Sequence, residues 1–157
     1  MGVKQEKLDT GTGRILAELL GRVWQINRMA STRSPGGLSP SHYRTLGLLA
    51  DRGACRVGDL AEGVHVSQPG MTKILHVLAE LGAVERAQDP DDSRATLVSV
   101  TPTGRALIRR RSEEIVALLL PSFTALSEAE RTTLRDAVDI LAKHMPGTST
   151  APGKETR

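Results

Sequence analysis

The chain has very few aromatic and sulfur-containing side chains. Its 157 residues include one Trp, one Tyr, one Phe and a single cysteine, Cys55. One cysteine excludes an internal disulfide framework and a metal site built from several cysteines, and it is typical of a protein in a reducing compartment. We expect Cys55 to be a small buried side chain, and a redox switch is the alternative interpretation.

Long apolar runs are also absent. No run approaches the roughly 20 residues that a membrane-spanning helix needs. The opening, MGVKQEKLDTGTGR, lacks the apolar core of a signal peptide. We therefore expect a cytoplasmic protein that makes no contact with a membrane.

The sequence contains none of the short motifs that mark common enzymes. It has no glycine-rich phosphate loop, no nucleophile elbow and no paired catalytic carboxylates. Asp89, Asp91 and Asp92 have the wrong spacing to a closing Glu for an EF-hand. His76 and Glu80 could supply only half of a metal site. We expect no enzymatic activity, no cofactor and no bound metal ion.

Both ends of the chain are rich in helix signals. Apolar residues recur at helical spacing over residues 15–30, before the breaker run SPGG at 34–37. Ser127 and Glu130 form a capping box that opens a last helix with an apolar stripe. The tail at 146–157, PGTSTAPGKETR, is too polar to order itself, so we expect it to be disordered.

Shorter elements follow the breaker run. Ser39 and Pro40 mark the start of a helix that ends near residues 51–53. A brief helix then runs from Val57 to Glu62 and closes at Gly63. The close spacing of these two helices leaves room for only a short connection between them.

A third short helix and a hairpin complete this central part. Ser67 is placed to cap the helix, and Thr101 caps a further helix after the hairpin. Residues 83–87 and the β-branched run 96–100 predict two strands, with the loop DPDD at 89–92 between them. Two helices, a turn and a hairpin are the parts of a winged helix-turn-helix.

The helix after Ser67 has two chemically different faces. The apolar face carries Met71, Ile74, Leu75, Leu78 and Leu81, and the opposite face carries Pro69, Thr72, Lys73, His76 and Glu80. Its first turn offers small polar groups, backbone N–H groups and the positive end of the helix dipole. Gln68 can pair with adenine in the major groove, and Thr72 can meet a thymine methyl group.

Arginines flank the hairpin loop. Arg86 precedes the loop and Arg94 follows its acidic residues, and arginine is the side chain favoured in narrow minor grooves. Carboxylates at a DNA surface are costly unless they are paired, so we expect Asp92 to pair with an arginine and to shape the wing. The net charge is only +3, from 21 Lys and Arg against 18 Asp and Glu. The local pattern therefore carries the prediction of double-stranded DNA binding.

At this point the sequence resembles the MarR family of bacterial transcriptional regulators. The resemblance covers about residues 38–107 and is most specific in DSR at 92–94 and VTPTG at 100–104. The segment VGDLAEGVHVSQPGMTKILHVLAELGAVER is similar to the helix-turn-helix of the family. The family commonly has glycine where His65 stands here.

The resemblance implies a homodimer built from the terminal helices, with a pocket for a small-molecule effector. The wide apolar faces of those helices, including Ile115 and Val116, agree with a dimer. We expect a mostly α-helical chain with a small β wing, in four parts. These are an N-terminal tail and dimerisation helix (1–37), the winged helix-turn-helix (38–101), C-terminal dimerisation helices (102–145) and a disordered tail (146–157).

The predicted function is that of a sequence-specific DNA-binding regulator, in the family usually a repressor that a small molecule releases. The predicted DNA contacts are Ser67, Gln68, Pro69, Thr72, Lys73, His76, Arg86, Ser93 and Arg94. Trp24, His42 and Tyr43 are candidates for an effector pocket, with a core role as the alternative. A winged helix used only for protein contact is a second functional alternative. Symmetry predicts a pseudo-palindromic operator with half-sites about 10 bp apart.

Overall fold

The computed structural model describes residues 11–31, 37–92 and 95–145. The chain divides into two units, residues 1–37 and 38–157. The described part of the first unit is one helix, α2 (Gly11–Ser31). Its apolar side chains Ile15, Leu20 and Trp24 are 68%, 67% and 62% exposed. The expected helix is therefore present and begins four residues earlier than the apolar pattern suggested.

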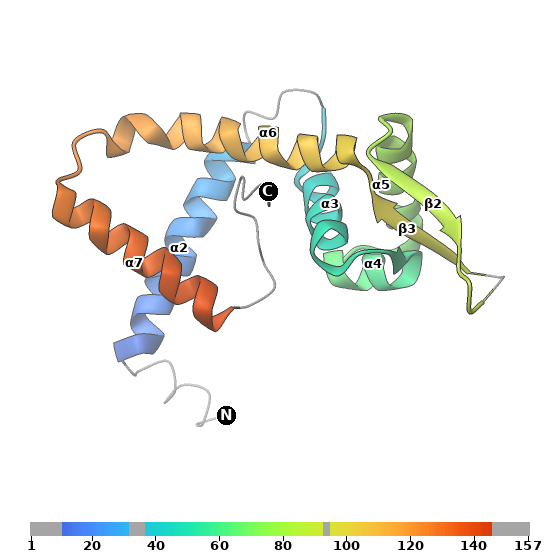
Figure 1. Cartoon of the computed structure of the whole chain (residues 1–157), viewed down its shortest axis with the longest axis horizontal. Helices are drawn as coiled ribbons and strands as arrows, with labels where there is room; N and C mark the ends of the chain where they lie inside the picture. The colour runs from blue at the N-terminus through green and yellow to red at the C-terminus, as the bar shows by residue number, and fades with distance from the viewer. Residues whose placement is uncertain (1–10, 32–36, 93–94, 146–157) are drawn as a thin grey trace, which may run out of the picture. The chain divides into compact units, whose positions relative to one another are not determined.

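The second unit is mostly helical with one small sheet, as the sequence predicts (Figure 1). Its elements are α3 (Pro40–Arg52), β1 (Cys55–Arg56), α4 (Val57–Val64), α5 (Gln68–Glu80), β2 (Val84–Gln88), β3 (Thr96–Val100), α6 (Pro102–Leu119), the 3₁₀ helix η1 (Leu120–Phe123) and α7 (Glu128–His144). Strand β1 and helix η1 were not expected from the sequence. Strand β1 has only two residues, too few for a period-two pattern.

One hydrophobic core joins α3, α4, α5 and the sheet. It consists of Leu38, Leu46, Leu49, Leu60, Ala61, Val64, Met71, Leu75, Leu78, Ala83, Val84 and Val98. Three of these, Met71, Leu75 and Leu78, come from the predicted apolar face of α5 and are fully buried. Leu81 is 47% exposed, contrary to expectation, because α5 ends at Glu80 and the chain turns away at Gly82, where φ is 63°.

The sheet is antiparallel, with strand order β1-β3-β2. Val84 faces Val100 and Gln88 faces Thr96, so β2 and β3 form the expected hairpin. On the other side of β3, Cys55 faces Val98. Figure 1 shows the hairpin extending past α4 and α5 as a wing.

Helix α4 runs one residue past the expected stop at Gly63. A Cβ atom at Gly63 would lie 2.7 Å from Leu48 Cδ2, so this glycine allows close packing of α3 on α4. The helix ends instead at Val64, with His65 in the left-handed conformation at φ 58° and ψ 49°. Glycine at position 63 therefore serves packing and does not terminate the helix.

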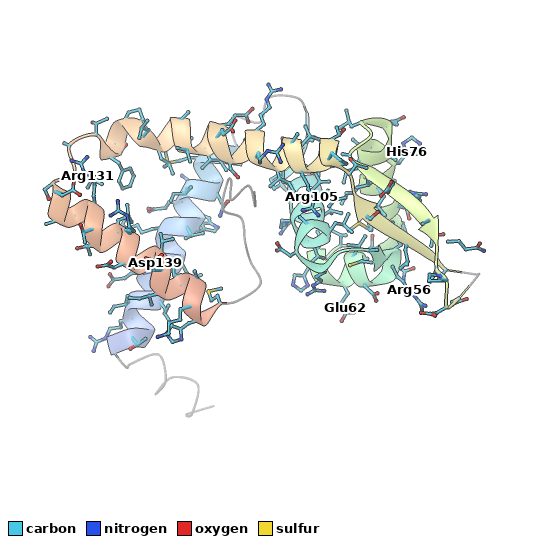
Figure 2. All side chains as sticks on the ribbon, viewed as in Figure 1. Arg56, Glu62, His76, Arg105, Arg131 and Asp139 are labelled. Atoms are coloured by element: carbon cyan, nitrogen blue, oxygen red, sulfur yellow. The ribbon has the colours of Figure 1, made fainter. Side chains whose placement is uncertain are left out.

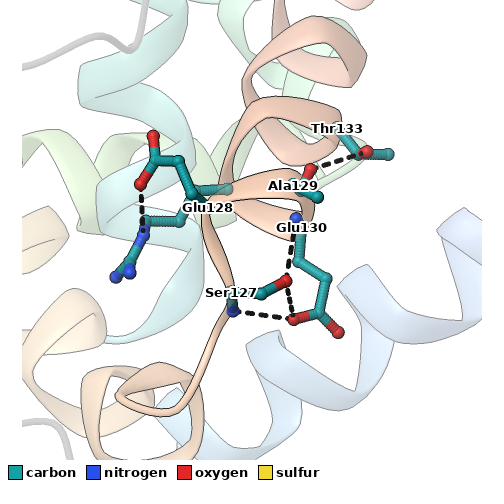
Figure 3. A network of polar contacts seen from close by, with 6 residues as sticks. Ser127, Glu128, Ala129, Glu130 and Thr133 are labelled. Carbon is teal, nitrogen blue, oxygen red and sulfur yellow. Dashed lines mark hydrogen bonds and ion pairs between the residues drawn. The ribbon is translucent and has the colours of Figure 1, made fainter.

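Helix caps set the starts of three helices as predicted. Gly70 N–H donates to Ser67 Oγ over 3.2 Å at the start of α5. Gly104 N–H donates to Thr101 Oγ1 over 3.1 Å at the start of α6. At the start of α7, Ser127 N–H donates to Glu130 Oε2 over 2.8 Å, and Glu130 N–H donates to Ser127 Oγ over 3.3 Å (Figure 3). Each cap satisfies backbone donors that a helix start leaves without partners.

The end of α5 is tied to the start of α6. Thr101 Oγ1 donates to the Gly82 carbonyl over 2.6 Å, and Thr101 N–H donates to the Ala83 carbonyl over 3.1 Å. A Cβ atom on Gly104 would collide with the Ala83 carbonyl oxygen, so only glycine allows α6 to approach this closely. We refer to Gly82, Ala83, Thr101 and Gly104 as the α5–α6 junction.

An ion pair holds the base of the wing. Arg56 Nε donates to Asp89 Oδ2 over 2.8 Å, and Arg56 Nη2 lies 2.6 Å from the same oxygen. Asp89 Oδ1 accepts the Asp91 N–H over 3.0 Å, and the Asp89 side chain is only 6% exposed. The sequence predicts an arginine partner for Asp92, and the structure shows one for Asp89. This pair connects the start of α4 to the wing loop.

Replacing Asp89 with asparagine should destabilise the fold at neutral pH. The Asp91 N–H and then the Arg56 guanidinium lower the pKa of Asp89 below its ordinary value of 3.8. A carboxylate with a lowered pKa stabilises the fold above its unfolded pKa, and this stability is lost as the pH falls through the folded pKa. Urea unfolding of the wild type and Asp89→Asn should therefore differ at pH 7 and converge only when the pH falls below the lowered pKa of Asp89 in the folded protein.

Asp91→Asn is the matched control, because Asp91 is an exposed neighbour that contributes its backbone N–H to the pair. We expect it to unfold close to the wild type at pH 7. Equal unfolding midpoints for Asp89→Asn and Asp91→Asn would show that the ion pair does not support the wing.

Candidate nucleic-acid interface

The face of α5 opposite the core is open to solvent. Pro69, Thr72, Lys73, His76 and Glu80 are all exposed, as the helical spacing predicts. His76 Nδ1 lies 3.6 Å from Glu80 Oε1, and these side chains are 72% and 66% exposed (Figure 2). The helix has no acidic residue in its first turn. Its N-terminal half is therefore suited to a polyanion, whereas its C-terminal half carries a carboxylate.

The polar groups of the first turn are partly occupied by the helix itself. Ser67 Oγ caps the helix, and Thr72 Oγ1 donates to the Gln68 carbonyl over 3.0 Å. These bonds fix the two hydroxyl groups in position. The Thr72 oxygen keeps its lone pairs and the methyl group remains on the surface, so this residue can still accept a hydrogen bond or contact a thymine methyl.

Gln68 lies beside the first turn of α4. Its Nε2 is 3.6 Å from the position that a Cβ atom on Gly58 would occupy. The lack of a side chain at Gly58 leaves space for the amide group. Gln68 is exposed, and in this rotamer its amide lies close to Gly58.

The wing supplies a second set of basic groups. Arg86 is exposed on β2, opposite Val98 on the neighbouring strand. Ser93 and Arg94, which the sequence places at the wing tip, lie outside the described residues. Arg56, at the base of the wing, was missed from the sequence. Its side chain is 47% exposed, and its positive charge is balanced by the contact with Asp89 (Figure 2).

The candidate effector residues lie in both units. His42 and Tyr43 are half-buried in α3, whereas Trp24 is on α2, where the Arg28 guanidinium lies 5.5 Å from its ring centroid. The Arg111 guanidinium lies 5.4 Å from the Tyr43 ring centroid. This cation–π contact connects α3 to α6 and was not visible in the sequence.

His42 takes part in the cap of α3. Ser39 N–H donates to His42 Nδ1 over 3.0 Å, so this nitrogen carries no proton. Burial lowers the pKa of His42 below 6.5, although the hydrogen bond from Ser39 has the opposite effect. The second ring nitrogen, Nε2, is buried and has no hydrogen-bond partner among the described residues. The neutral ring therefore carries a buried donor at Nε2.

Cys55 is half-buried in β1, and burial raises the pKa of its thiol. Nearby Arg52 acts in the opposite direction and Asp59 in the same direction as burial. A raised pKa favours the protonated thiol, which is a poor nucleophile. This environment fits a structural side chain better than the redox alternative.

The part of the chain that the structure describes holds neither a metal-binding cluster nor a membrane-spanning helix. No group of three or more His, Cys, Asp or Glu side chains there is arranged to hold a metal ion. Within the same residues, no helix is both long and apolar enough to cross a membrane.

Comparison with known proteins agrees with this geometry. A model of the MarR family matches residues 36–95. An HTH-type transcriptional regulator of Mycobacterium tuberculosis is 33% identical over 129 residues, covering 82% of this chain and 90% of that protein. A second such regulator, from Bacillus subtilis, is 29% identical, covering 81% of this chain and 77% of that protein.

Solved structures show the same fold. A transcriptional regulator from Thermotoga maritima aligns with a TM-score of 0.67 and 23% identity, covering 84% of this chain and 92% of that one. A mutant MarR from E. coli aligns with a TM-score of 0.62 and 24% identity, covering 80% of this chain and 95% of that one. With its winged helix and exposed α5 face, the chain belongs to the MarR family of DNA-binding helix-turn-helix transcriptional regulators.

Proposed function

We propose that this regulator is a repressor that binds a pseudo-palindromic operator as a homodimer and is released by a small-molecule effector. The observation that carries the DNA-binding mechanism is the two-faced burial of α5, which buries Met71, Leu75 and Leu78 fully and exposes its polar face. A relative from Pseudomonas putida that is named as a transcriptional repressor supports repression. It is 28% identical over 104 residues, which cover 66% of this chain and 62% of that protein. A regulator of this kind acts in the cytoplasm, where bacterial DNA lies.

The proposed contacts divide between the two grooves. The first half of α5 enters the major groove, where Gln68 and Thr72 meet bases and Lys73 meets phosphate. The wing reaches the neighbouring minor groove through its arginines. The full set is Ser67, Gln68, Pro69, Thr72, Lys73, His76, Arg86, Ser93 and Arg94, of which Ser93 and Arg94 are proposed from the sequence.

The effector is proposed to bind near His42 and Tyr43. The buried Nε2 of His42 is a polar group without a partner, and Arg111 supplies positive charge at the Tyr43 ring. Buried donors of this kind gain free energy when a ligand accepts their hydrogen bond. Trp24, on α2 of the other unit, remains a separate candidate for an effector contact.

Exposed apolar side chains support the homodimer. On α7, Leu134 and Val138 are 50% and 57% exposed and lie one turn apart, with Met145 further along the same stripe. Helix α2 exposes a similar stripe. Such continuous apolar surface is costly in water, and a second copy of the chain would cover it.

Lys73→Ala should weaken binding to DNA about tenfold, because it removes one phosphate contact. The measurement is fluorescence anisotropy with a duplex selected from a random pool, titrated between about 50 and 200 mM salt. The slope of log K against log salt should become less steep by about one. Lys143→Ala is the matched control, since Lys143 is the other lysine among the described residues and lies on α7.

We expect Lys143→Ala to bind like the wild type. Identical curves for both lysine variants would place Lys73 outside the interface. Salt-independent binding by the wild type, or none, would favour the alternative of a winged helix that contacts only proteins.

Val138→Glu should convert the dimer into monomers, because it introduces a charge into the apolar stripe of α7. Light scattering at micromolar concentration should give twice the chain mass of 16.8 kDa for the wild type and the single mass for the variant. Thr132→Glu adds the same charge to the opposite, polar side of α7 and should remain dimeric. A monomeric wild type would contradict the two-fold operator model.

A further inference from the structure

His65 occupies a backbone conformation that usually requires glycine. Its φ and ψ are 58° and 49°, and it is the one non-glycine residue with positive φ among the described residues. Its N–H donates to the Glu62 carbonyl over 3.0 Å, and Val66 N–H donates to the Ala61 carbonyl over 2.9 Å. These bonds close the end of α4 in the pattern in which glycine is preferred, because a Cβ atom is strained there.

The same chain uses glycine at two other helix ends with positive φ. Gly82 follows α5 with φ 63°, and Gly53 follows α3 with φ 81° but with ψ −149°, a different conformation from that of His65. Histidine tolerates the left-handed region better than most residues, but it is still less stable there than glycine. The turn between α4 and α5 therefore carries a strain that the other two helix ends avoid.

Packing does not account for the side chain at this position. His65 is exposed to solvent, so few contacts hold its imidazole. Strain that persists without a packing benefit is characteristic of residues kept for a function.

The location of His65 suggests what this function is. It stands two residues before Ser67, the N-cap of α5, whose first turn is the part of the helix proposed to enter the major groove. Phosphates of the groove edge lie beside the N-terminus of a recognition helix and accept hydrogen bonds from nearby donors. A histidine side chain always has at least one ring nitrogen that can donate.

We propose that His65 donates a hydrogen bond from its imidazole to a DNA phosphate and so fixes the N-terminus of α5 in the groove. This inference rests on the proposed function. It adds a contact that is absent from the nine residues proposed above and that comes from the turn itself. In this proposal, the backbone strain at His65 is tolerated because it positions the imidazole donor beside the DNA.

Two substitutions separate the effect of the His65 hydrogen-bond donor on DNA affinity from the effect of its backbone strain on stability. His65→Gly removes both, so its melting temperature should rise by about 2–4 °C, while affinity for the selected duplex should fall about five- to tenfold. His65→Asn keeps a side chain that tolerates positive φ but is too short to reach as far, so it should lose affinity to a similar degree. His144→Asn, at the end of α7, is the control for loss of an exposed imidazole and should bind like the wild type.

A phosphate scan tests the contact directly. Neutral methylphosphonate linkages are introduced one at a time into the selected duplex. One linkage in each half-site should weaken the wild type but leave His65→Gly unaffected, whereas the Lys73 contact should appear at another linkage in both proteins.

Other outcomes have distinct meanings. If His65→Gly binds within twofold of the wild type, or if both proteins give the same scan, the contact does not exist although the proposed function stands. If the wild type fails to bind any duplex, the proposed function fails and this inference fails with it.

Discussion

The burial of one face of α5 is the interaction on which the rest of the structure depends. Met71, Leu75 and Leu78 are fully buried, and each contributes about 1.5–3 kcal/mol relative to an exposed side chain. Because this face is held by α3, α4 and the sheet, the opposite face needs no apolar contacts and can remain polar. A helix anchored in this way presents its surface in one fixed orientation, which recognition of a rigid partner such as DNA requires.

Polar contacts and backbone pairing hold the wing, which the hydrophobic core does not cover. The core fixes α5, but a two-stranded hairpin has little core of its own and is marginally stable alone. The Arg56–Asp89 pair ties the hairpin loop to the start of α4, and β1 adds a third strand. The wing and the helix pair therefore behave as one body, because each end of the hairpin is bonded to the rest of the unit.

Local signals explain why so much of the fold could be predicted. Ser67, Thr101 and Ser127 each act as the cap that the sequence indicates, because a cap depends on residues within one turn. The exposed face of α5 followed from helical spacing for the same reason. The MarR family and its fold were also correctly inferred from short motifs.

The features that the sequence did not predict depend on contacts between residues far apart in the chain. Arg56 and Asp89 are 33 positions apart, and Tyr43 meets Arg111 across two elements, so no local pattern signals either contact. Gly63 was taken for a helix stop because its contact with Leu48 on α3 is equally invisible in sequence. The DNA and effector contacts of individual residues remain predictions, since they depend on partners that the chain alone does not contain.

The α5–α6 junction couples the C-terminal end of α5 to α6, so a movement of α6 is passed to α5 at this end. Helix α5 has 13 residues and is about 20 Å long, and its C-terminal end is bonded to α6 through Thr101 and Gly82. A tilt of about 5° at this end moves the N-terminus by nearly 2 Å, by simple proportion to that length. Hydrogen bonds to bases tolerate only a few tenths of an ångström. A small rotation of α6 that tilts α5 would therefore be large enough to break hydrogen bonds made by its N-terminal turn, and it would also shift the fully buried Met71 at that end.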